Sequence, residues 1–244
     1  MVELSSSRLY LDQPYRHEFE AEVLASADGW CALSRTLFYP GGGGQPADRG
    51  YLLLRGDALL VSAVREDDGR IWHQVRRDLK AGEVIEGAID WPFRYMLMRQ
   101  HGLMHLVNTV MRERFGGVIT GVQLGPDRSR IDFKLDGFTR EQVAELEHDV
   151  NAVIQRGLRI SSAIISEDEY RRRPELIRTL NVLPPIVDGR VRIVEIETFD
   201  TQACGGTHVH STSEIGSAHV ARFDNKGKDN KRFYWELTAD PQTL

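Results

Sequence analysis

The segment "FRYMLMRQHGLMHLVNTVMRERFGG", residues 93–117, divides this chain into two parts. It has no internal proline and stops at Gly116 and Gly117, which is the pattern of a long helix. The sequence patterns before and after this segment differ. The segment before it contains only short, turn-bounded stretches, and the segment after it mixes helical and strand patterns, so we expect two domains that meet near residue 90.

Residues 1–90 predict short strands separated by turns. Regular short strands with turn signals are typical of a small β-barrel or sandwich. The expected strands lie in "EFEAEVLAS", "GWCALSRTLFY", "GYLLLRG", "ALLVSAVRE", "RIWHQV" and "EVIEGAID".

Residues 91–244 predict an α+β domain. The segment 139–157 opens with a capping box, Thr139 and Gln142, and ends at Gly157, so it predicts a second helix. Ser166 and Glu169 predict the cap of a short third helix. Because strand patterns such as "RVRIVEIETF", "IGSAHVARF" and "KRFYWELT" occur without strict alternation with helices, α+β is favoured over α/β.

The composition of the chain indicates which kinds of binding partner and which cellular compartment to expect. Hydrophobic residues make up 41% and charged residues 27% of the 244-residue chain, and its net charge of -5 argues weakly against nucleic acid. Two segments, 170–178 and 225–232, are nevertheless locally basic. The N-terminus lacks a signal-peptide pattern and no apolar run reaches membrane length, so we expect a cytoplasmic protein without membrane attachment. Two cysteines do not form a disulfide framework, and Cys31 is expected in the core.

Four side chains have the spacing of a metal site. His101 and His105 lie four residues apart on the long helix, so their imidazoles share one face. Cys204 and His208 frame the glycines Gly205 and Gly206, which allow a sharp turn. One thiolate and three imidazoles are a donor set that favours one Zn²⁺ per chain.

The residues alone leave alternatives to this zinc site. Cys204 and His208 could also act without metal, as a nucleophile with its base. A zinc protease is not indicated, because no glutamate follows the first histidine of the helical pair. His210 would share the side of His208 if this segment is a strand, which would place it behind the metal ligands or beside the substrate.

A run of four glycines, Gly41, Gly42, Gly43 and Gly44, is the second unusual segment. Its backbone N–H groups could hold a phosphate, although no Gly-Lys-Ser/Thr follows to make a P-loop. The alternative is a flexible hairpin turn, with Gln45 and Asp48 as ordinary turn residues.

Three ordered motifs together resemble one family. "RTLFYPGGGGQPADRG", "RQHGLMH" and "CGGTHVHSTSEIG" are similar to the editing region of alanyl-tRNA synthetase, and to the longer form of the free-standing alanyl-tRNA editing proteins, the AlaX family. The resemblance covers about residues 8–238. It implies a β-barrel domain (1–90) followed by a two-layer α+β editing domain (91–244) shared with threonyl-tRNA synthetase.

The resemblance also implies an activity and a site. The activity is that of an aminoacyl-tRNA deacylase, which hydrolyses mischarged tRNA(Ala), chiefly seryl-tRNA(Ala), with glycyl-tRNA(Ala) second. By motif, His101, His105, Cys204 and His208 match the zinc ligands, and the glycine run with Gln45 matches a substrate-side segment of the seryl-specific forms. Thr120 or Gln123 falls where the family discriminates serine, and Gly102 stands where a hydroxyl residue is frequent.

A tRNA partner requires basic contacts, and the two basic segments supply them. The predicted phosphate contacts, whose strength falls as salt rises, are Arg171, Arg172, Arg173, Lys226, Lys228, Lys231 and Arg232. No obligate protein partner is indicated. Two other functions stay open at this point: a zinc-dependent esterase for a small substrate, and a non-catalytic zinc-containing RNA-binding module.

Overall fold

The computed structural model describes residues 5–177 and 186–238 and divides the chain into two compact units. The first unit is Met1–Gly42 with Pro46–Met96, and the second is Gly43–Gln45 with Leu97–Leu244. The division therefore falls inside the long helix, shortly after the boundary expected near residue 90. It also places part of the glycine run in the second unit.

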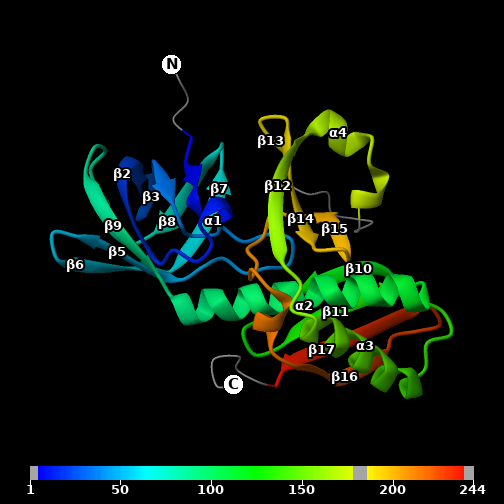
Figure 1. The fold of residues 1–244 in the computed structure, drawn as a ribbon. Helices are drawn as coiled ribbons and strands as arrows, with labels where there is room; N and C mark the ends of the chain where they lie inside the picture. The colour runs from blue at the N-terminus through cyan, green and yellow to red at the C-terminus, as the bar shows by residue number, and fades with distance from the viewer. Residues whose placement is uncertain (1–4, 178–185, 239–244) are drawn as a thin grey trace. The chain divides into compact units, whose positions relative to one another are not determined.

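The first unit is built on a seven-stranded antiparallel sheet with the order β6-β5-β9-β2-β3-β8-β7 (Figure 1). In β2 exposed and buried residues alternate, as a strand with one face on a core requires. A short parallel pair, β1 (Ser7–Arg8) with β4 (Arg35–Thr36), and the helical turn α1 (Leu9–Asp12) complete the unit. The sheet strands are β2 (Glu18–Ala27), β3 (Trp30–Leu33), β5 (Gly50–Leu54), β6 (Asp57–Val61), β7 (Ala63–Asp67), β8 (Arg70–Gln74) and β9 (Val84–Ile89).

This sheet curls like half a barrel, but it is not a closed barrel. Its edges are β6 and β7, and no hydrogen-bonded ladder joins them among the described strands. The two edge strands are consecutive in the chain and separated only by Ser62, whose N–H donates to the Gln74 carbonyl at 2.9 Å. The β-barrel expectation is thus confirmed only as a strongly curled sheet, because the edges approach at one corner without pairing along their length.

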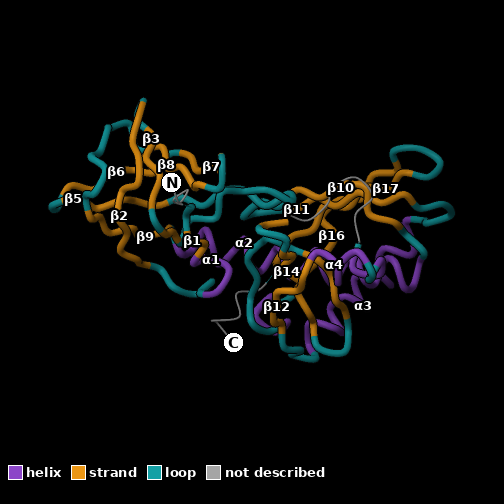
Figure 2. The backbone as a smooth tube through the Cα atoms, turned by 90° about the horizontal axis from the view of Figure 1, so that it is seen from above, coloured by secondary structure: helices purple, strands orange, loops and turns teal. Residues whose placement is uncertain are grey.

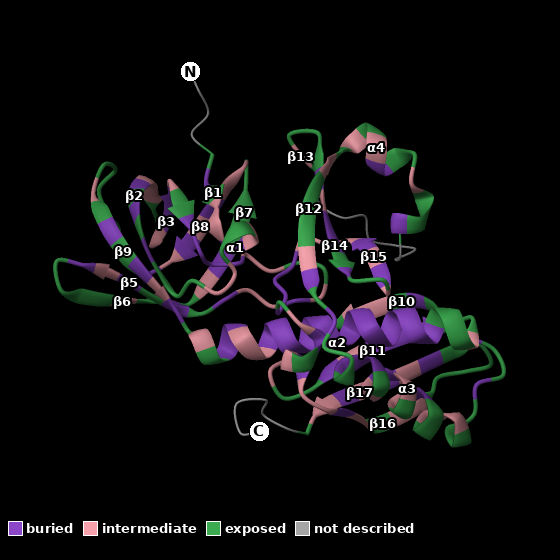
Figure 3. Cartoon of the chain, viewed as in Figure 1, coloured by how far each residue is buried: buried purple, intermediate pink, exposed green. Residues whose placement is uncertain are grey.

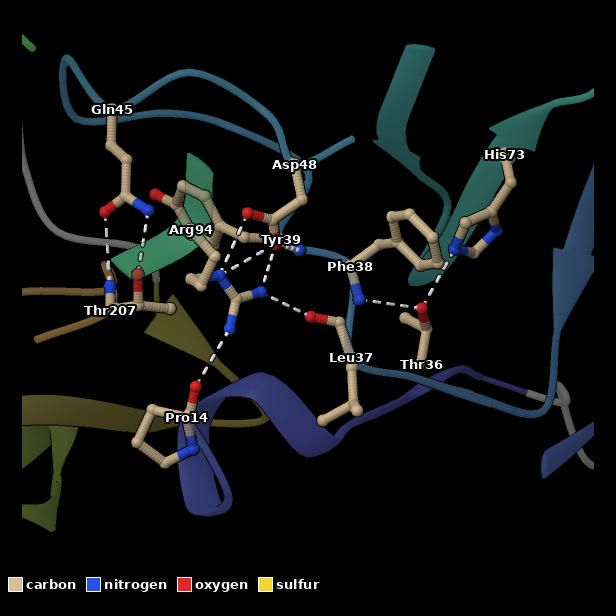
Figure 4. Close-up of polar contacts among 10 residues, drawn as sticks. All are labelled: Pro14, Thr36, Leu37, Phe38, Tyr39, Gln45, Asp48, His73, Arg94 and Thr207. Carbon is tan, nitrogen blue, oxygen red and sulfur yellow. Dashed lines mark hydrogen bonds and ion pairs between the residues drawn. The ribbon is translucent and has the colours of Figure 1, made fainter. Parts of the chain in front are cut away.

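A buried ion pair between Asp48 and Arg94 organises the segment after the glycine run (Figure 4). The side chain of Arg94 is 0% exposed and that of Asp48 is 1% exposed. Arg94 also donates to the carbonyls of Leu37 at 2.5 Å and Pro14 at 3.3 Å, while the N–H of Tyr39 donates to Asp48 Oδ2 at 2.6 Å. Asp48 is therefore not an ordinary turn residue, since its carboxylate neutralises a guanidinium in the core.

We predict that Asp48→Asn lowers the free energy of unfolding by about 3–5 kcal/mol, because it leaves the buried guanidinium of Arg94 uncompensated. Asp57→Asn is the matched control, since the Arg77–Asp57 pair is 49% and 69% exposed and should change stability by less than about 0.5 kcal/mol. Urea unfolding curves measure both variants. Equal effects of the two substitutions would contradict the role given to the buried pair.

His73 is a buried structural histidine in the same unit (Figure 4). Its Nδ1 lies 3.3 Å from the Cys31 carbonyl, which can only accept, so Nδ1 carries the proton. Its Nε2 then accepts from the Thr36 hydroxyl at 2.9 Å, and that hydroxyl oxygen accepts the Phe38 N–H at 3.0 Å. Burial lowers the pKa of His73 to about 4.

The lowered pKa of His73 predicts acid sensitivity of the fold. Between pH 6.5 and 4, His73 binds a proton in the unfolded chain but not in the folded chain. The free energy of unfolding therefore falls as the pH drops through this range. From pH 7 to pH 5 we expect this residue to account for a loss of about 2 kcal/mol. His73→Gln should reduce that loss, measured by denaturant unfolding at each pH. Parallel pH profiles of the variant and the wild type would refute the assignment.

The second unit combines two antiparallel sheets with the helices α2 and α3 (Figures 1 and 2). Asn151 of α3 bonds the backbone of Ala218 in β16 through both amide atoms, at 2.8 and 3.0 Å, which fixes this helix to its sheet. The first sheet has the order β10 (Val118–Gln123), β11 (Ser129–Lys134), β17 (Asn230–Leu237), β16 (Ala218–Asn225). The second pairs β14 (Arg190–Ile196) with β12 (Ile160–Ser166), β13 (Ile186–Val187) and β15 (Asp200–Ala203).

The predicted helices of this unit are confirmed. The long helix is α2 (Trp91–Phe115), followed by Gly116 with φ of 72°, and every residue from 97 to 111 is buried (Figure 3). The capping box of Thr139 and Gln142 closes a 3₁₀ turn, Arg140–Gln142, that continues into α3 (Val143–Gln155). Ser166 caps α4 (Glu167–Arg171) by accepting from the Glu169 N–H. None of the described helices has the length and apolar character that crossing a membrane needs.

Candidate metal centre

The structure brings the four predicted metal ligands to one point. The ligand atoms of His101, His105, Cys204 and His208 all lie within 4.8 Å of one another. Cys204 Sγ is 3.4 Å from His101 Nε2 and 3.8 Å from His208 Nε2, and His208 Nε2 is 3.1 Å from His105 Nε2. The helix supplies one pair and the loop after β15 supplies the other, across about a hundred residues of sequence.

Burial keeps the three imidazoles in the form that binds metal. It lowers the pKa of His101 and of His208 well below the ordinary value, with neighbouring imidazoles and Arg192 adding to the effect. The pKa of His105 is lowered to about 3, mainly by burial and to a lesser extent by the positive charge of Arg192. Burial raises the pKa of the Cys204 thiol, although Arg192 opposes this. A metal cation would stabilise the thiolate directly, because ligands bind in their deprotonated form.

Arg192 of β14 holds the loop that carries two of the ligands. Its Nη1 donates to the carbonyls of Cys204 and Gly206, both at 2.9 Å, and its own carbonyl accepts the Cys204 N–H at 3.1 Å. The carbonyl of Gly206 in turn accepts from His208 Nδ1 at 3.1 Å. This leaves the lone pair of His208 Nε2 facing the other ligands. The contribution of Arg192 was not predicted from the sequence, where its only signal is a charged residue between the apolar residues Val191 and Ile193.

Gly206 lies in a bend of the ligand loop, as expected, but glycine is required there for close approach. Its φ is not in the left-handed region, so the bend itself does not require glycine. A Cβ at this position would lie 2.2 Å from His101 Cε1 and 2.5 Å from His101 Nδ1. Only a residue without a side chain therefore lets the loop reach the helix at the ligand His101.

The end of the glycine run lies beside this centre within the second unit. Gln45 is 2% exposed, and its Oε1 is 2.8 Å from His101 Nδ1. The Gly44 carbonyl accepts the Leu124 N–H at 2.8 Å, and a Cβ on Gly44 would lie 2.5 Å from the Val122 carbonyl oxygen. The segment Gly43–Gln45 thus connects the end of β10 with a metal ligand. Gly41 and Gly42 belong to the first unit.

The two candidate serine-discriminating residues lie on β10. Thr120 is the extra residue of a β-bulge, because the register with β11 shifts between Ile119 and Gly121. A bulge redirects the side chain that it contains. Gln123 pairs in register with Arg130, and it is adjacent to Val122 and Leu124, which contact Gly44. Both Thr120 and Gln123 are exposed.

Two further residues have surroundings that differ from expectation. A Cβ on Gly102 would meet the side chains of Ile215 at 3.2 Å and Val209 at 3.5 Å, so this position faces apolar packing. Residues 204–210 form no strand, so the expectation that His210 shares a strand face with His208 is wrong. His210 is exposed, and its N–H donates to Glu214 Oε1 at 3.0 Å.

The predicted tRNA-contacting residues differ in how far they are already paired. Lys231 is buried, and its Nζ donates to the side chain of Asn225 and to two backbone carbonyls, so it closes a hairpin loop. Within residues 5–177 and 186–238, Arg172 and Lys228 have no ion-pair partner. The others pair with carboxylates: Arg171 with Glu167, Arg173 with Glu169 and Glu175, Lys226 with Asp224, and Arg232 with Asp132.

The cluster meets the requirements of a metal site. It offers one sulfur and three nitrogen donors, which is a full tetrahedral set. The Nδ1 of His208 is occupied by a carbonyl and that of His101 faces Gln45, so their Nε2 atoms point inward. Partners that orient the ligating histidines in this way are a regular feature of metal centres.

Two known families match separate segments of this chain. The family described as "Threonyl and Alanyl tRNA synthetase second additional domain" matches residues 191–234, which include Cys204 and His208. The family described as "tRNA synthetases class II (A)" matches residues 4–93, which include the glycine run.

Full-length relatives carry both regions in one chain. The alanyl-tRNA editing protein AlaX-M of Methanosarcina barkeri is 40% identical over 237 residues, covering 94% of this chain and 98% of the relative. AlaX-M of Saccharolobus solfataricus is 34% identical over 236 residues, with 95% and 99% covered. The alanine–tRNA ligase of Ignicoccus hospitalis is 35% identical over 216 residues, which are 87% of this chain and 24% of the ligase. The chain therefore belongs to the AlaX-M family of alanyl-tRNA editing proteins, which is homologous to the editing region of alanyl-tRNA synthetase.

Proposed function

We propose that this protein is a trans-editing deacylase that hydrolyses the ester of mischarged tRNA(Ala), chiefly seryl-tRNA(Ala), with glycyl-tRNA(Ala) as a second substrate. The observation that carries the proposal is the convergence of three motifs within the second unit. The helical histidine pair, the Cys-Gly-Gly-Thr-His loop and Gln45 of the glycine run meet at one buried centre. The names of the relatives, alanyl-tRNA editing protein and alanine–tRNA ligase, indicate the nucleic acid involved.

We assign Zn²⁺ to the centre because its donor set is one cysteine and three histidines. Soft sulfur with imidazole nitrogen selects zinc over magnesium or calcium. When bound, zinc would supply Lewis acidity and a fixed point for orienting the ester or a water molecule. The protein contributes the rigid holder, in which His101 and His208 are already oriented and Arg192 fixes the loop between Cys204 and His208.

Selectivity for serine requires a partner for its hydroxyl. Serine is larger than alanine by this group, so a synthetic pocket cannot strongly exclude it, and an editing pocket must instead recognise it. Thr120 is the first candidate, because it carries a hydroxyl and is the extra residue of the β-bulge in the strand whose end, at Val122 and Leu124, contacts Gly44. Gln123 is the second candidate. A group that substrate binding buries and leaves without a hydrogen-bond partner costs about 1–3 kcal/mol, which is about 5- to 150-fold in rate.

The tRNA backbone would contact the basic residues of the two segments 170–178 and 225–232. Arg172 and Lys228 are the strongest candidates, since the described residues contain no ion-pair partner for either. Arg171, Arg173, Lys226 and Arg232 would exchange a carboxylate partner for phosphate. Lys231 is buried in contacts within its own hairpin, so we expect it to stabilise segment 225–232 and not to bind phosphate.

The test is deacylation of seryl-tRNA(Ala) and alanyl-tRNA(Ala) in parallel by the zinc-loaded protein. We expect rapid loss of serine with alanine spared, and loss of that activity in Cys204→Ala, which removes the one sulfur donor. If neither ester is cleaved while tRNA still binds, the protein is a binding module instead. Cleavage of small esters without tRNA binding would identify a simple esterase.

The same assay locates the discriminating residue. Thr120→Val removes the hydroxyl but keeps the shape, so the ratio of seryl to alanyl deacylation rates should fall by about 5- to 150-fold. Thr120→Ser retains the hydroxyl and should keep the ratio within a few-fold. An unchanged ratio in Thr120→Val, with a reduced ratio in Gln123→Leu, would transfer the role to Gln123.

A further inference from the structure

We propose that Gln45 is a positioning residue that fixes the tautomer of the metal ligand His101, and that it does not bind the substrate. This inference rests on the metal site proposed above. The resemblance placed Gln45 with the glycine run on the substrate side, whereas its hydrogen bonds join it to the ligand His101 and to Thr207 of the ligand loop.

The orientation of the Gln45 amide follows from one backbone group. The Thr207 N–H points at Oε1 at 3.2 Å, and a backbone N–H can only donate, so this atom must be the oxygen (Figure 4). The Nε2 atom then donates to the Thr207 hydroxyl at 2.9 Å. The two ends of the amide are thus distinguished by chemistry, because exchanging them would place two donors against each other.

The tautomer of His101 follows from that orientation. An amide oxygen only accepts, so His101 Nδ1, at 2.8 Å from Gln45 Oε1, must carry the ring proton. A neutral imidazole has one proton, which leaves a lone pair on Nε2. That nitrogen is the atom that faces Cys204 Sγ at 3.4 Å. Gln45 therefore selects the form of His101 that can bind a metal.

The three histidine ligands differ in which group, if any, fixes their tautomer. The tautomer of His208 is fixed by the Gly206 carbonyl, and that of His101 by Gln45. The buried Nδ1 of His105 has no hydrogen-bond partner among the described residues. Among the described residues, two acceptors thus orient the histidine ligands: the Gln45 side chain for His101 and the Gly206 carbonyl for His208.

The surroundings leave Gln45 little capacity for a substrate. The residue is 2% exposed, and Oε1 already accepts two hydrogen bonds. A Cβ on Gly206 would lie 2.7 Å from Gln45 Oε1 and 2.5 Å from His101 Nδ1, so this glycine provides the space in which the bond forms. Gly44 fixes the backbone just before Gln45 through its bond with Leu124.

The experiment compares Gln45→Leu with Gln45→Glu in the full chain. Leucine removes both amide functions, whereas the carboxylate of glutamate can still accept from His101 Nδ1 and from the Thr207 N–H. Loss of such an orienting partner commonly weakens metal binding 10- to 100-fold. In competition with a chelator, we expect zinc affinity to fall about 10- to 100-fold in Gln45→Leu and to stay within a few-fold of wild type in Gln45→Glu.

A spectroscopic measurement and a matched control separate positioning from general damage. Gln155→Leu makes the same substitution at an exposed position of α3 and should leave zinc affinity unchanged. In the metal-free protein, nitrogen-15 NMR should show the Nδ1–H form of His101 in wild type and Gln45→Glu, and a mixture of tautomers in Gln45→Leu.

This test can fail independently of the proposed function, because neither the zinc affinity nor the NMR signal of the His101 tautomer depends on tRNA. Unchanged zinc affinity in Gln45→Leu, or equal losses in Gln45→Leu and Gln45→Glu, would overturn the positioning role. A changed ratio of seryl to alanyl deacylation with normal zinc affinity would return Gln45 to the substrate side. Failure of deacylation in the wild type would leave the zinc and NMR results valid.

Discussion

Four donor atoms that face one another, three on buried imidazoles and one on the half-buried thiol of Cys204, organise the second unit. They lie within 4.8 Å of one another, so the cluster must be satisfied by protons or by a cation. The remaining architecture supports this arrangement. The buried helix α2 presents two ligands one turn apart, and β14 supplies Arg192, which holds the loop carrying the other two.

Two glycines near the donor atoms allow the chain segments around the centre to approach one another closely. Gly206 and Gly44 each sit where a Cβ would collide with a neighbour, His101 in the first case and the Val122 carbonyl in the second. These close approaches bring the ligand loop and the glycine run to the helix and to β10. As a result, a residue that lies about 160 positions before Thr207 in the sequence shares a hydrogen bond with it.

The parts of this molecule that local chemistry determines could be predicted from the sequence. The i,i+4 spacing of His101 and His105 and the caps at Thr139 and Ser166 act within a few residues, and the structure confirms each of them. The role of Arg192, the contact between Gln45 and His101, and the open edges of the curled sheet depend on segments far apart in the chain. The bulge at Thr120 likewise requires the register with β11, which no pattern in one strand contains.

X-ray absorption spectroscopy of the zinc-loaded protein, with metal content measured on the same sample, tests whether the four side chains form one metal centre. We expect one zinc per chain with one sulfur neighbour at about 2.3 Å and three nitrogen neighbours at about 2.0–2.1 Å. A zinc environment without sulfur, or a chain that retains no stoichiometric zinc, would contradict the assignment of Cys204 and the three histidines as one metal centre.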